Sequence, residues 1–287
     1  MGRIKQPIKK PLRVALGVIG VVALAIFYSY LSHQQHIKNP DDTTLPNLKQ
    51  LVEGLRLVVT PRENSLAAAF GLEEKETTFL GSIKNTWLFQ DAVATYGRLF
   101  KGLLWGCGLA VILGTLMGCY EKLAAILAPP LSYLAKVPGT AMLAVFFVIV
   151  GTGEPMFVAM IGFGVLPTLT HAIYLSARDD IHEEEIDKAY TLGASSLEVI
   201  WNVVFRQILP KILDAVRLQI GPAMVFLIAA EMLVGQVGMG YQIRMQQRLL
   251  HMNIVYNYLL ILGLTGLFMD RGMIVLREWS CPWYGRS

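Results

Sequence analysis

Long apolar runs without charged residues dominate this chain. Five stretches contain no Asp, Glu, Lys or Arg, and they cover residues 14–31, 102–120, 137–153, 155–177 and 252–269. A sixth stretch, 218–243, carries a single charge at Glu231. Each run approaches the ~20 residues that a helix rising ~1.5 Å per residue needs to cross hydrocarbon. The pattern predicts an all-α, polytopic membrane protein with about six transmembrane helices.

Basic residues before the first run indicate how the chain is oriented. Five of them lie near the N-terminus: Arg3, Lys5, Lys9, Lys10 and Arg13. Such clusters stay in the cytoplasm. The run that follows is longer than the apolar part of a signal peptide and has no small-residue cleavage site behind it, so we expect it to be retained. Six alternating crossings then place both termini in the cytoplasm.

The polar segments between the runs divide the chain. We expect a cytoplasmic N-terminus with the first transmembrane helix over 1–31, an external connector over 32–91, a core of five transmembrane helices over 92–276 and a cytoplasmic tail over 277–287. In the connector, a short helix is expected at 48–58 with Asn47 as its cap, and the stretch 62–87 is expected to form a small helix followed by a loop. This segment offers too little core for a substrate-binding domain, so a connector is favoured.

Composition agrees with a membrane protein and argues against other classes of function. Only 16% of the residues are charged, against roughly 25% in soluble domains, and 54% are hydrophobic. The basic residues are not arrayed on a soluble domain, which argues against nucleic acid as a partner. Three cysteines and five scattered histidines show neither a disulfide framework nor the spacing of a metal site.

One polar stretch, residues 178–212, stands out and is called the elbow below. Thirteen charged residues lie between Arg178 and Arg217. At about 2.5–3.5 kcal/mol each, they would cost on the order of 30 kcal/mol at the centre of a bilayer. The elbow must therefore lie in water or on another protein, and the alternation of crossings places it in the cytoplasm.

Capping patterns predict two helices in the elbow. A short polar residue is followed three residues later by Glu in two places, Asp180 with Glu183 and Ser195 with Glu198. Gly193 lies between them, where a left-handed turn is needed, and Pro210 is expected to end the second helix.

Each elbow helix is expected to have an apolar face. The first face contains Ile186, Ala189 and Tyr190, and the second contains Leu197, Ile200, Trp201, Val204 and Ile208. A helix pair of this kind either lies on the bilayer surface or docks on a cytoplasmic protein. The acidic character of the first helix favours docking, because helices that lie on lipid are usually basic.

The elbow resembles the EAA loop of ABC-importer permeases. Asp187-Lys188-Ala189 matches the Glu-Ala-Ala positions, Gly193 the following glycine, and Leu209-Pro210 the later Leu-Pro. The chain departs from that pattern in three places: Asp187 replaces Glu, Lys188 replaces Ala, and Phe205-Arg206 stands where many relatives have an earlier Leu-Pro. The resemblance implies that the ATPase-coupling residues are Glu185, Asp187, Lys188, Ala189, Gly193, Leu209 and Pro210.

Other segments extend this resemblance over about residues 95–283. They are TYGRLFKG, LAPPLSYLAKVPGTAML, IAAEMLVGQVGMGYQI and LLILGLTGLFMDRGMIVLREW, in that order. The Glu-Met of AAEM and the Met-Asp-Arg ending are typical of nitrate, sulfonate, taurine and bicarbonate permeases.

The resemblance implies a type I importer fold in the bacterial inner membrane, with a homodimer of permeases forming the pathway for a small anion. Its implied partners are cytoplasmic ATPase subunits that carry ATP and Mg, an external substrate-binding protein, and membrane lipid. The sequence contains no G-x-x-x-x-G-K-[ST] motif. We therefore expect no cofactor on this chain and hydrolysis on a separate subunit, so the chain itself is not an enzyme.

Three polar residues near or within the runs are candidates for the transport pathway. Glu231 is either a pathway residue or a structural group bonded to a neighbouring helix near the external end. Lys136 follows Pro129-Pro130 and precedes Pro138, where a broken helix can line a binding region; alternatively its ammonium group reaches the cytoplasmic interface. His171 is more often a packed polar residue than a ligand.

Two other features bear on the class of protein. Gly102 with Gly106 and Gly114 with Gly118 have the four-residue spacing that lets membrane helices approach closely. A secondary transporter or channel acting alone is the alternative function, but it leaves the capped elbow without a role. An integral-membrane enzyme ranks last, because the runs contain no paired carboxylates, nucleophile-base spacing or metal cluster.

Overall fold

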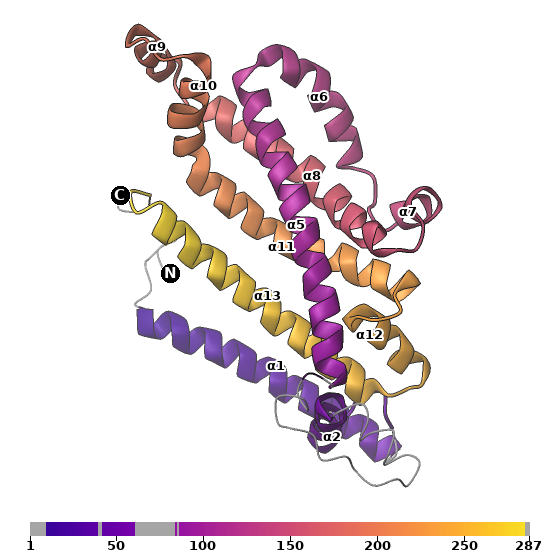
Figure 1. Ribbon diagram of the computed structural model, residues 1–287. Helices are drawn as coiled ribbons and strands as arrows, with labels where there is room; N and C mark the ends of the chain where they lie inside the picture. The colour runs from indigo at the N-terminus through magenta and orange to yellow at the C-terminus, as the bar shows by residue number, and fades with distance from the viewer. Residues whose placement is uncertain (1–9, 40–41, 61–83, 85, 285–287) are drawn as a thin grey trace.

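The computed structural model describes residues 10–39, 42–60, 84 and 86–284. Over these residues the chain forms helices joined by turns, with no strand. Five helices are long and apolar enough to cross a membrane. They belong to α1 (Lys10–Lys38), α5 (Trp87–Cys119), α8 (Glu154–Asp179), α11 (Arg206–Val234) and α13 (Met252–Ser280). Figure 1 shows α5, α8, α11 and α13 as one elongated bundle. The small helix and loop expected within 62–87 lie mostly outside the described residues.

Helices α5 and α8 pack in parallel through the predicted glycines. A Cβ added to Gly102 would lie 2.6 Å from Ile161, and one added to Gly114 would lie 2.8 Å from Ile173. Gly118 faces Ala177 in the same way. The partners advance along α8 in step with the glycines along α5, so the two helices run in the same direction. The expectation of close helix packing at these glycines is confirmed.

The third transmembrane helix, expected at 137–153, is not one continuous helix. The chain forms α6 (Glu121–Leu134), a turn, and the nine-residue α7 (Met142–Val150). Pro129 and Pro130 lie inside α6, and Pro138 follows in the turn, where a proline removes a backbone donor. Because α5 and α8 are parallel, the α6–α7 segment carries the chain back along the bundle. The third crossing therefore begins earlier than predicted and is broken.

The run 218–243 is also divided. α11 ends at Val234, and α12 (Met239–Arg248) follows as a separate helix. Gly238 has φ +128°, a backbone conformation that favours glycine, and it turns the chain between these two helices. This turn brings the start of α12 back onto the side chain of Glu231.

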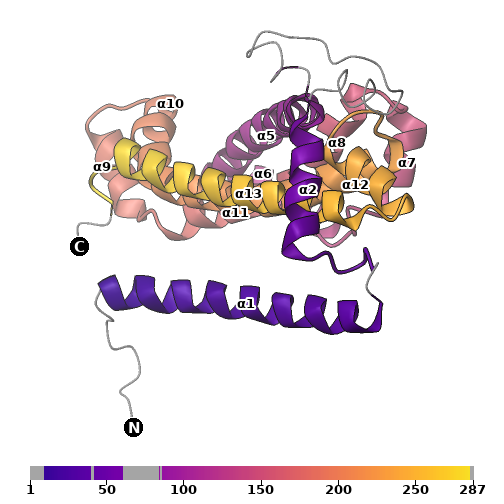
Figure 2. The same ribbon diagram turned by 90° about the horizontal axis from the view of Figure 1, so that it is seen from below.

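The described helix of the connector, α2 (Leu48–Val59), packs at the same end of the bundle as α12 (Figures 1 and 2). α2 begins at Asn47, whose side chain and that of Gln50 form a reciprocal capping box, as expected for Asn47. Asn257 of α13 donates to the Leu51 carbonyl at 2.8 Å. Figure 2 shows α1 standing apart from the other long helices.

Candidate functional site

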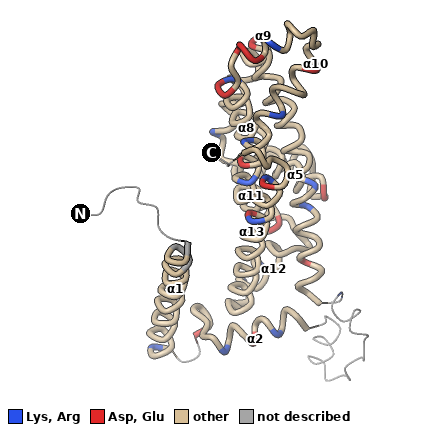
Figure 3. Tube along the Cα trace, turned by 90° about the vertical axis from the view of Figure 1, so that its left-hand side faces the viewer, with Lys and Arg blue, Asp and Glu red and all other residues tan. Residues whose placement is uncertain are grey.

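The elbow forms the end of the molecule opposite α12 and α2 (Figure 1). It contains α9 (Glu183–Thr191) and a second helix that opens with α10 (Ser196–Glu198). Gly193 lies between them with φ +85°, so the predicted left-handed turn is confirmed. Figure 3 shows acidic and basic residues gathered on α9, at the tip of the bundle.

One of the two predicted capping boxes is present. Ser195 accepts a hydrogen bond from the Glu198 backbone, and the Glu198 carboxylate accepts one from the Ser195 backbone at 2.7 Å. The Asp180 cap is wrong, because His182 precedes α9 and makes no side-chain cap. Asp180 instead ends α8, and its carboxylate pairs with Lys211.

The second elbow helix does not end at Pro210. A π-helical segment, Val199–Phe205, continues directly into α11, and Pro210 is buried inside that helix. Proline in a long helix costs one backbone hydrogen bond, and irregular turns next to it commonly accommodate this loss. The elbow is therefore continuous with a transmembrane helix.

The π-helical segment also changes which side chains are buried. Of the predicted apolar stripe, Val204 and Ile208 are buried, and Val199 joins them. Leu197 and Trp201 are 77% and 61% exposed, so the predicted stripe has a buried part and an exposed part. A π-helix advances more residues per turn than an α-helix, which changes the spacing of buried positions after Val199.

The exposed side chains form an apolar surface at the end of the elbow. Leu192, 88% exposed, lies beside Gly193 in the turn. We call Leu192, Leu197 and Trp201 the elbow tip. Trp201 is stacked on Phe205, with ring centroids 4.7 Å apart. Exposed apolar groups among charged residues are typical of a protein-interaction surface.

The predicted coupling residues fall into two groups. Glu185, Asp187, Lys188 and Ala189 lie on α9, next to Gly193, whereas Leu209 and Pro210 lie inside α11. Lys188 forms an exposed ion pair with Glu184 at 3.7 Å.

Two polar contacts hold α9 and the end of α8 to the start of α11. The Gln207 amide donates to Glu185 of α9, and Lys211 pairs with Asp180 at the end of α8. Ile186 of α9 packs against the main apolar core. The elbow is therefore a braced unit whose tip projects away from the bundle.

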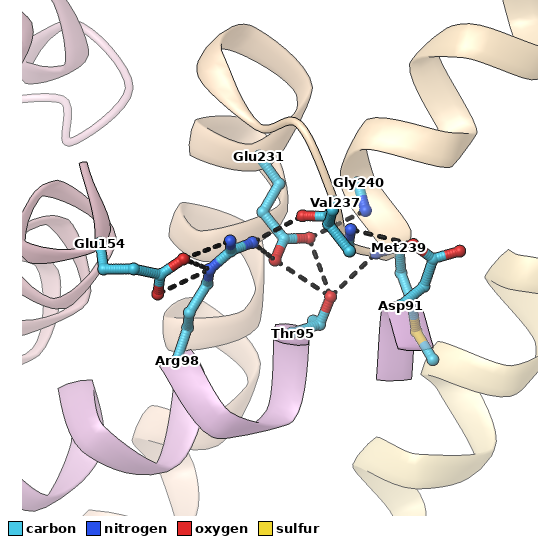
Figure 4. A network of polar contacts seen from close by, with 9 residues as sticks. Asp91, Thr95, Arg98, Glu154, Glu231, Val237, Met239 and Gly240 are labelled. Atoms are coloured by element: carbon cyan, nitrogen blue, oxygen red, sulfur yellow. Dashed lines mark hydrogen bonds and ion pairs between the residues drawn. The ribbon is translucent and has the colours of Figure 1, made fainter. Parts of the chain in front are cut away.

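A polar cluster, buried except for Glu154, occupies the opposite half of the molecule (Figure 4). It consists of Asp91, Thr95, Arg98, Glu154 and Glu231. The Glu231 side chain is fully buried, and its carboxylate accepts hydrogen bonds from Arg98 at 2.8 Å, Thr95 at 2.9 Å and the Gly240 backbone at 2.9 Å.

Arg98 holds the centre of this polar cluster. Its guanidinium group donates to Glu154 at 3.0 Å and to the Val237 carbonyl at 2.7 Å, and it lies 4.1 Å from the centroid of the Phe157 ring. Charge-assisted bonds of this kind are stronger than neutral ones. The contacts connect α5 with α8, with α11 and with the turn before α12.

Asp91 and Thr95 complete the cluster. Asp91 accepts from the Gly238 backbone at 3.0 Å and from the Tyr258 hydroxyl at 2.8 Å, which adds α13. Thr95 accepts from the Met239 backbone at 2.8 Å. The geometry thus shows Glu231 bonded to neighbouring elements near the end of α11, as in the structural interpretation.

The three candidate pathway residues do not meet. Glu231 is in the polar cluster, and Lys136 is exposed in the turn between α6 and α7. His171 lies on α8, nearer the elbow, with its ring centroid 6.0 Å from that of Tyr174. Its buried Nδ1 has no hydrogen-bond partner among the residues described here.

Sequence reasoning missed Arg98 as the partner of Glu231. The second transmembrane helix was expected over roughly residues 92–120, which includes Arg98, but the charge of Arg98 was not paired with that of Glu231; the observed helix α5 begins at Trp87. A charge enclosed in a membrane helix needs an opposite charge nearby. Glu231, the one acidic residue inside the apolar runs, was the available signal.

No metal site is found in the described part of the chain, where no group of three or more His, Cys, Asp or Glu is placed to hold an ion. Cys107, Cys119 and Cys281 are free thiols. Burial raises the pKa of the Cys281 thiol, just beyond α13, above its ordinary value.

Comparisons with known proteins agree with this geometry. The chain is 29% identical to a putative ABC transporter permease protein of Methanocaldococcus jannaschii, over 71% of this chain and 77% of that protein. It is 24% identical to the taurine transport system permease protein of Escherichia coli, over 74% and 78%. It is also 24% identical to the bicarbonate transport system permease protein of Synechococcus elongatus, over 67% and 69%.

A solved structure supports the fold. A chain of the MetNI methionine ABC transporter, in inward-facing conformations, superposes with a TM-score of 0.52 at 16% identity, covering 66% of this chain and 91% of that one. The family model for the inner membrane component of binding-protein-dependent transport systems matches residues 107–276. Since that match covers more than half of the chain, the protein belongs to this family and is a multi-pass ABC transporter permease.

Proposed function

We propose that this permease couples a separate cytoplasmic ATPase to the import of a small anion. The observation that carries the proposal is the elbow: a braced helix pair with an exposed apolar tip, continuous with a transmembrane helix. An apolar tip on a charged projection is suited to a groove on a partner protein. The chain lacks a phosphate-binding loop, so ATP and Mg would be held by that partner.

Coupling would run from the elbow tip into the bundle. α9 is held to the start of α11 through Glu185 and Gln207, and the end of α8 is held there through Asp180 and Lys211. A push on the tip would therefore move α8 and α11 together. In this proposal Gly193 sets the angle of the elbow, and Asp187 and Lys188, which are exposed on α9, contact the ATPase.

The remaining partners follow from the family. Two copies of the chain would form the pathway as a homodimer, and an external binding protein would deliver the ligand. Both termini and the elbow would lie in the cytoplasm, in keeping with the basic residues before α1. Relatives named for taurine and bicarbonate transport favour a small anion as the ligand.

Reconstitution tests the proposal. The chain would be co-expressed with the ATPase and binding protein encoded beside it, purified, and placed in proteoliposomes. ATP-dependent uptake of labelled taurine, nitrate and bicarbonate would then be measured. Uptake of one of these anions, with the ATPase retained, supports the proposal; uptake without any ATPase would favour a secondary transporter or channel.

A matched pair of variants tests the docking surface. Leu192→Asp places a charge on the elbow tip and should abolish retention of the ATPase. Glu184→Gln changes an exposed polar residue on α9 and should leave retention unchanged. Equal retention in both variants would contradict docking through the tip.

A further inference from the structure

A cavity of about 240 Å³ lies between the α6–α7 turn, α8 and α11. Thr168 and Gln219 are the polar side chains of its wall that matter here. Thr168 lies 14 residues after the start of α8 and 11 before its end, and Gln219 lies 13 residues into α11 with 15 remaining. The cavity therefore lies within the membrane-spanning part of these helices, between the elbow and the polar cluster.

The wall of the cavity is suited to water. Pro167 and Pro222 line it, and each proline leaves one helix carbonyl without its usual donor. Irregular backbone at this depth is tolerated where it faces protein or a water-filled cavity rather than lipid. Thr168 is exposed on the surface of the chain, which likewise favours a wet pathway.

In the described part of the chain, hydrogen-bond donors of the Gln219 side chain have no acceptor in this cavity. The single Thr168 proton has two acceptors in reach, the Val165 carbonyl at 3.1 Å and the Gln219 Oε1 atom at 3.2 Å. The amide nitrogen of Gln219 has no acceptor among the described residues. Its two N–H groups are therefore available to a ligand.

Phe226 closes one end of the cavity. It lies two helical turns beyond Gln219, toward the end of α11 that holds the polar cluster. A Cβ added to Gly139 or to Gly164 would collide with the Phe226 ring. The two glycines thus form a slot for the ring between the α6–α7 turn and α8, and larger residues would displace it.

We propose that this cavity is a transient binding site for the transported oxyanion, in which the Gln219 amide and the Thr168 hydroxyl donate to its oxygens. This inference rests on the proposed function. Of the residues that line the cavity, none named here carries a charge, so binding would be weak. A pathway site must bind strongly enough for entry and weakly enough for release. Phe226 would separate the site from the external end.

Cysteine accessibility tests the site without relying on transport. In the assembled complex, with Cys107, Cys119 and Cys281 replaced by serine, Gln219→Cys would be compared with Leu218→Cys. Leu218 is the adjacent residue and is 67% exposed on the outside of the chain. The reagent is a methanethiosulfonate carrying an ethylsulfonate group, itself a small oxyanion.

Cysteine at position 219 should react at least about tenfold faster than cysteine at 218, because the thiolate that reacts forms in water and not in lipid. Equal rates at the two positions would overturn the inference, even in a complex that transports normally.

Uptake provides the second measurement. Gln219→Leu removes both donors and should lower uptake about tenfold or more, the effect of losing a hydrogen bond to a charged group. Gln219→Asn keeps the amide and should retain part of the uptake. ATPase retention should not change in either variant, which distinguishes this result from failure of coupling. Full uptake by Gln219→Leu would also overturn the inference.

Discussion

Arg98 Nη1 lies 2.8 Å from Glu231 Oε1, and both side chains are almost completely buried. The two residues come from α5 and α11, far apart in the sequence. Removing two charges from water costs several kcal/mol per ion unless they are paired and their remaining groups are bonded. Here the carboxylate also accepts from Thr95 and Gly240, so the pair is fully supported.

Glu231→Gln should therefore destabilise the protein strongly. The substitution leaves Arg98 without its buried counter-charge, and breaking a buried pair typically costs about 3–5 kcal/mol. The measurement is the midpoint of thermal unfolding of the purified protein in detergent. The matched control is Glu154→Gln, since that carboxylate also pairs with Arg98 but its side chain is 59% exposed.

The Glu154→Gln variant should lose much less stability, because exposed ion pairs contribute about 0–1 kcal/mol. A double variant that also carries Arg98→Met should recover part of the loss caused by Glu231→Gln, since neither charge of the buried pair then remains. Equal losses in the two single variants would show that burial of the pair is not what stabilises this end of the bundle.

Glycine packing between α5 and α8 makes a second prediction. Gly114→Leu should lower the unfolding midpoint and the amount of assembled protein, because a Cβ there would lie 2.8 Å from the Thr170 carbonyl oxygen. Gly108→Leu, on the same helix, has nothing within 4 Å of its Cβ and should be tolerated. Similar behaviour of the two variants would contradict close packing at Gly114.

Much of the fold was predictable from local patterns. The apolar runs predicted the long helices, because backbone groups in lipid must be bonded internally and a helix achieves this within one segment. The left-handed Gly193, the Ser195 cap and the Asn47 cap were predictable because each depends on residues adjacent in the sequence. None of these local features depends on a contact with a residue far away in the sequence.

Features that depend on distant contacts were not predictable in this way. Asp180 fits the sequence pattern of a helix cap, yet its carboxylate forms an ion pair with Lys211. Pro210 predicts a helix end, yet it lies inside α11, directly after a π-helical segment. The Arg98–Glu231 pair joins two helices that are far apart in the sequence. The sequence of one helix does not indicate which residue of the other will pair with its charge.

Lys136 allows a test of charge near the proposed pathway. It is exposed in the α6–α7 turn. Its neighbours Ala135 and Val137 line the same cavity as Thr168 and Gln219. Lys136→Glu should reduce anion uptake, because a negative charge at the rim would repel the ligand. Lys136→Arg keeps the charge and should retain uptake. The measurement is ATP-dependent uptake at equal complex assembly, and normal uptake by Lys136→Glu would remove Lys136 from the pathway.

Gly193→Val should uncouple ATP hydrolysis from transport. Gly193 has φ +85°, a conformation that costs a side chain roughly 1–3 kcal/mol, and a β-branched residue is among the least tolerant of it. The space around its Cβ position is open, so the effect would come from the backbone and not from a collision. The turn would relax toward negative φ and re-aim α9 relative to the helix that continues into α11.

The measurement on Gly193→Val compares ligand-stimulated ATPase activity with uptake in proteoliposomes. We expect the protein to reach the membrane in normal amounts, with stimulation and uptake both lost. Gly193→Asn should keep coupling, because Asn tolerates the left-handed region better than other side chains. Gly108→Val adds the same side chain to an unstrained helical position and should have no effect. The second elbow helix continues without a break into α11. If the ligand stimulated the ATPase activity of Gly193→Val as strongly as that of the unmodified complex, the angle at this turn would not control the position of α11.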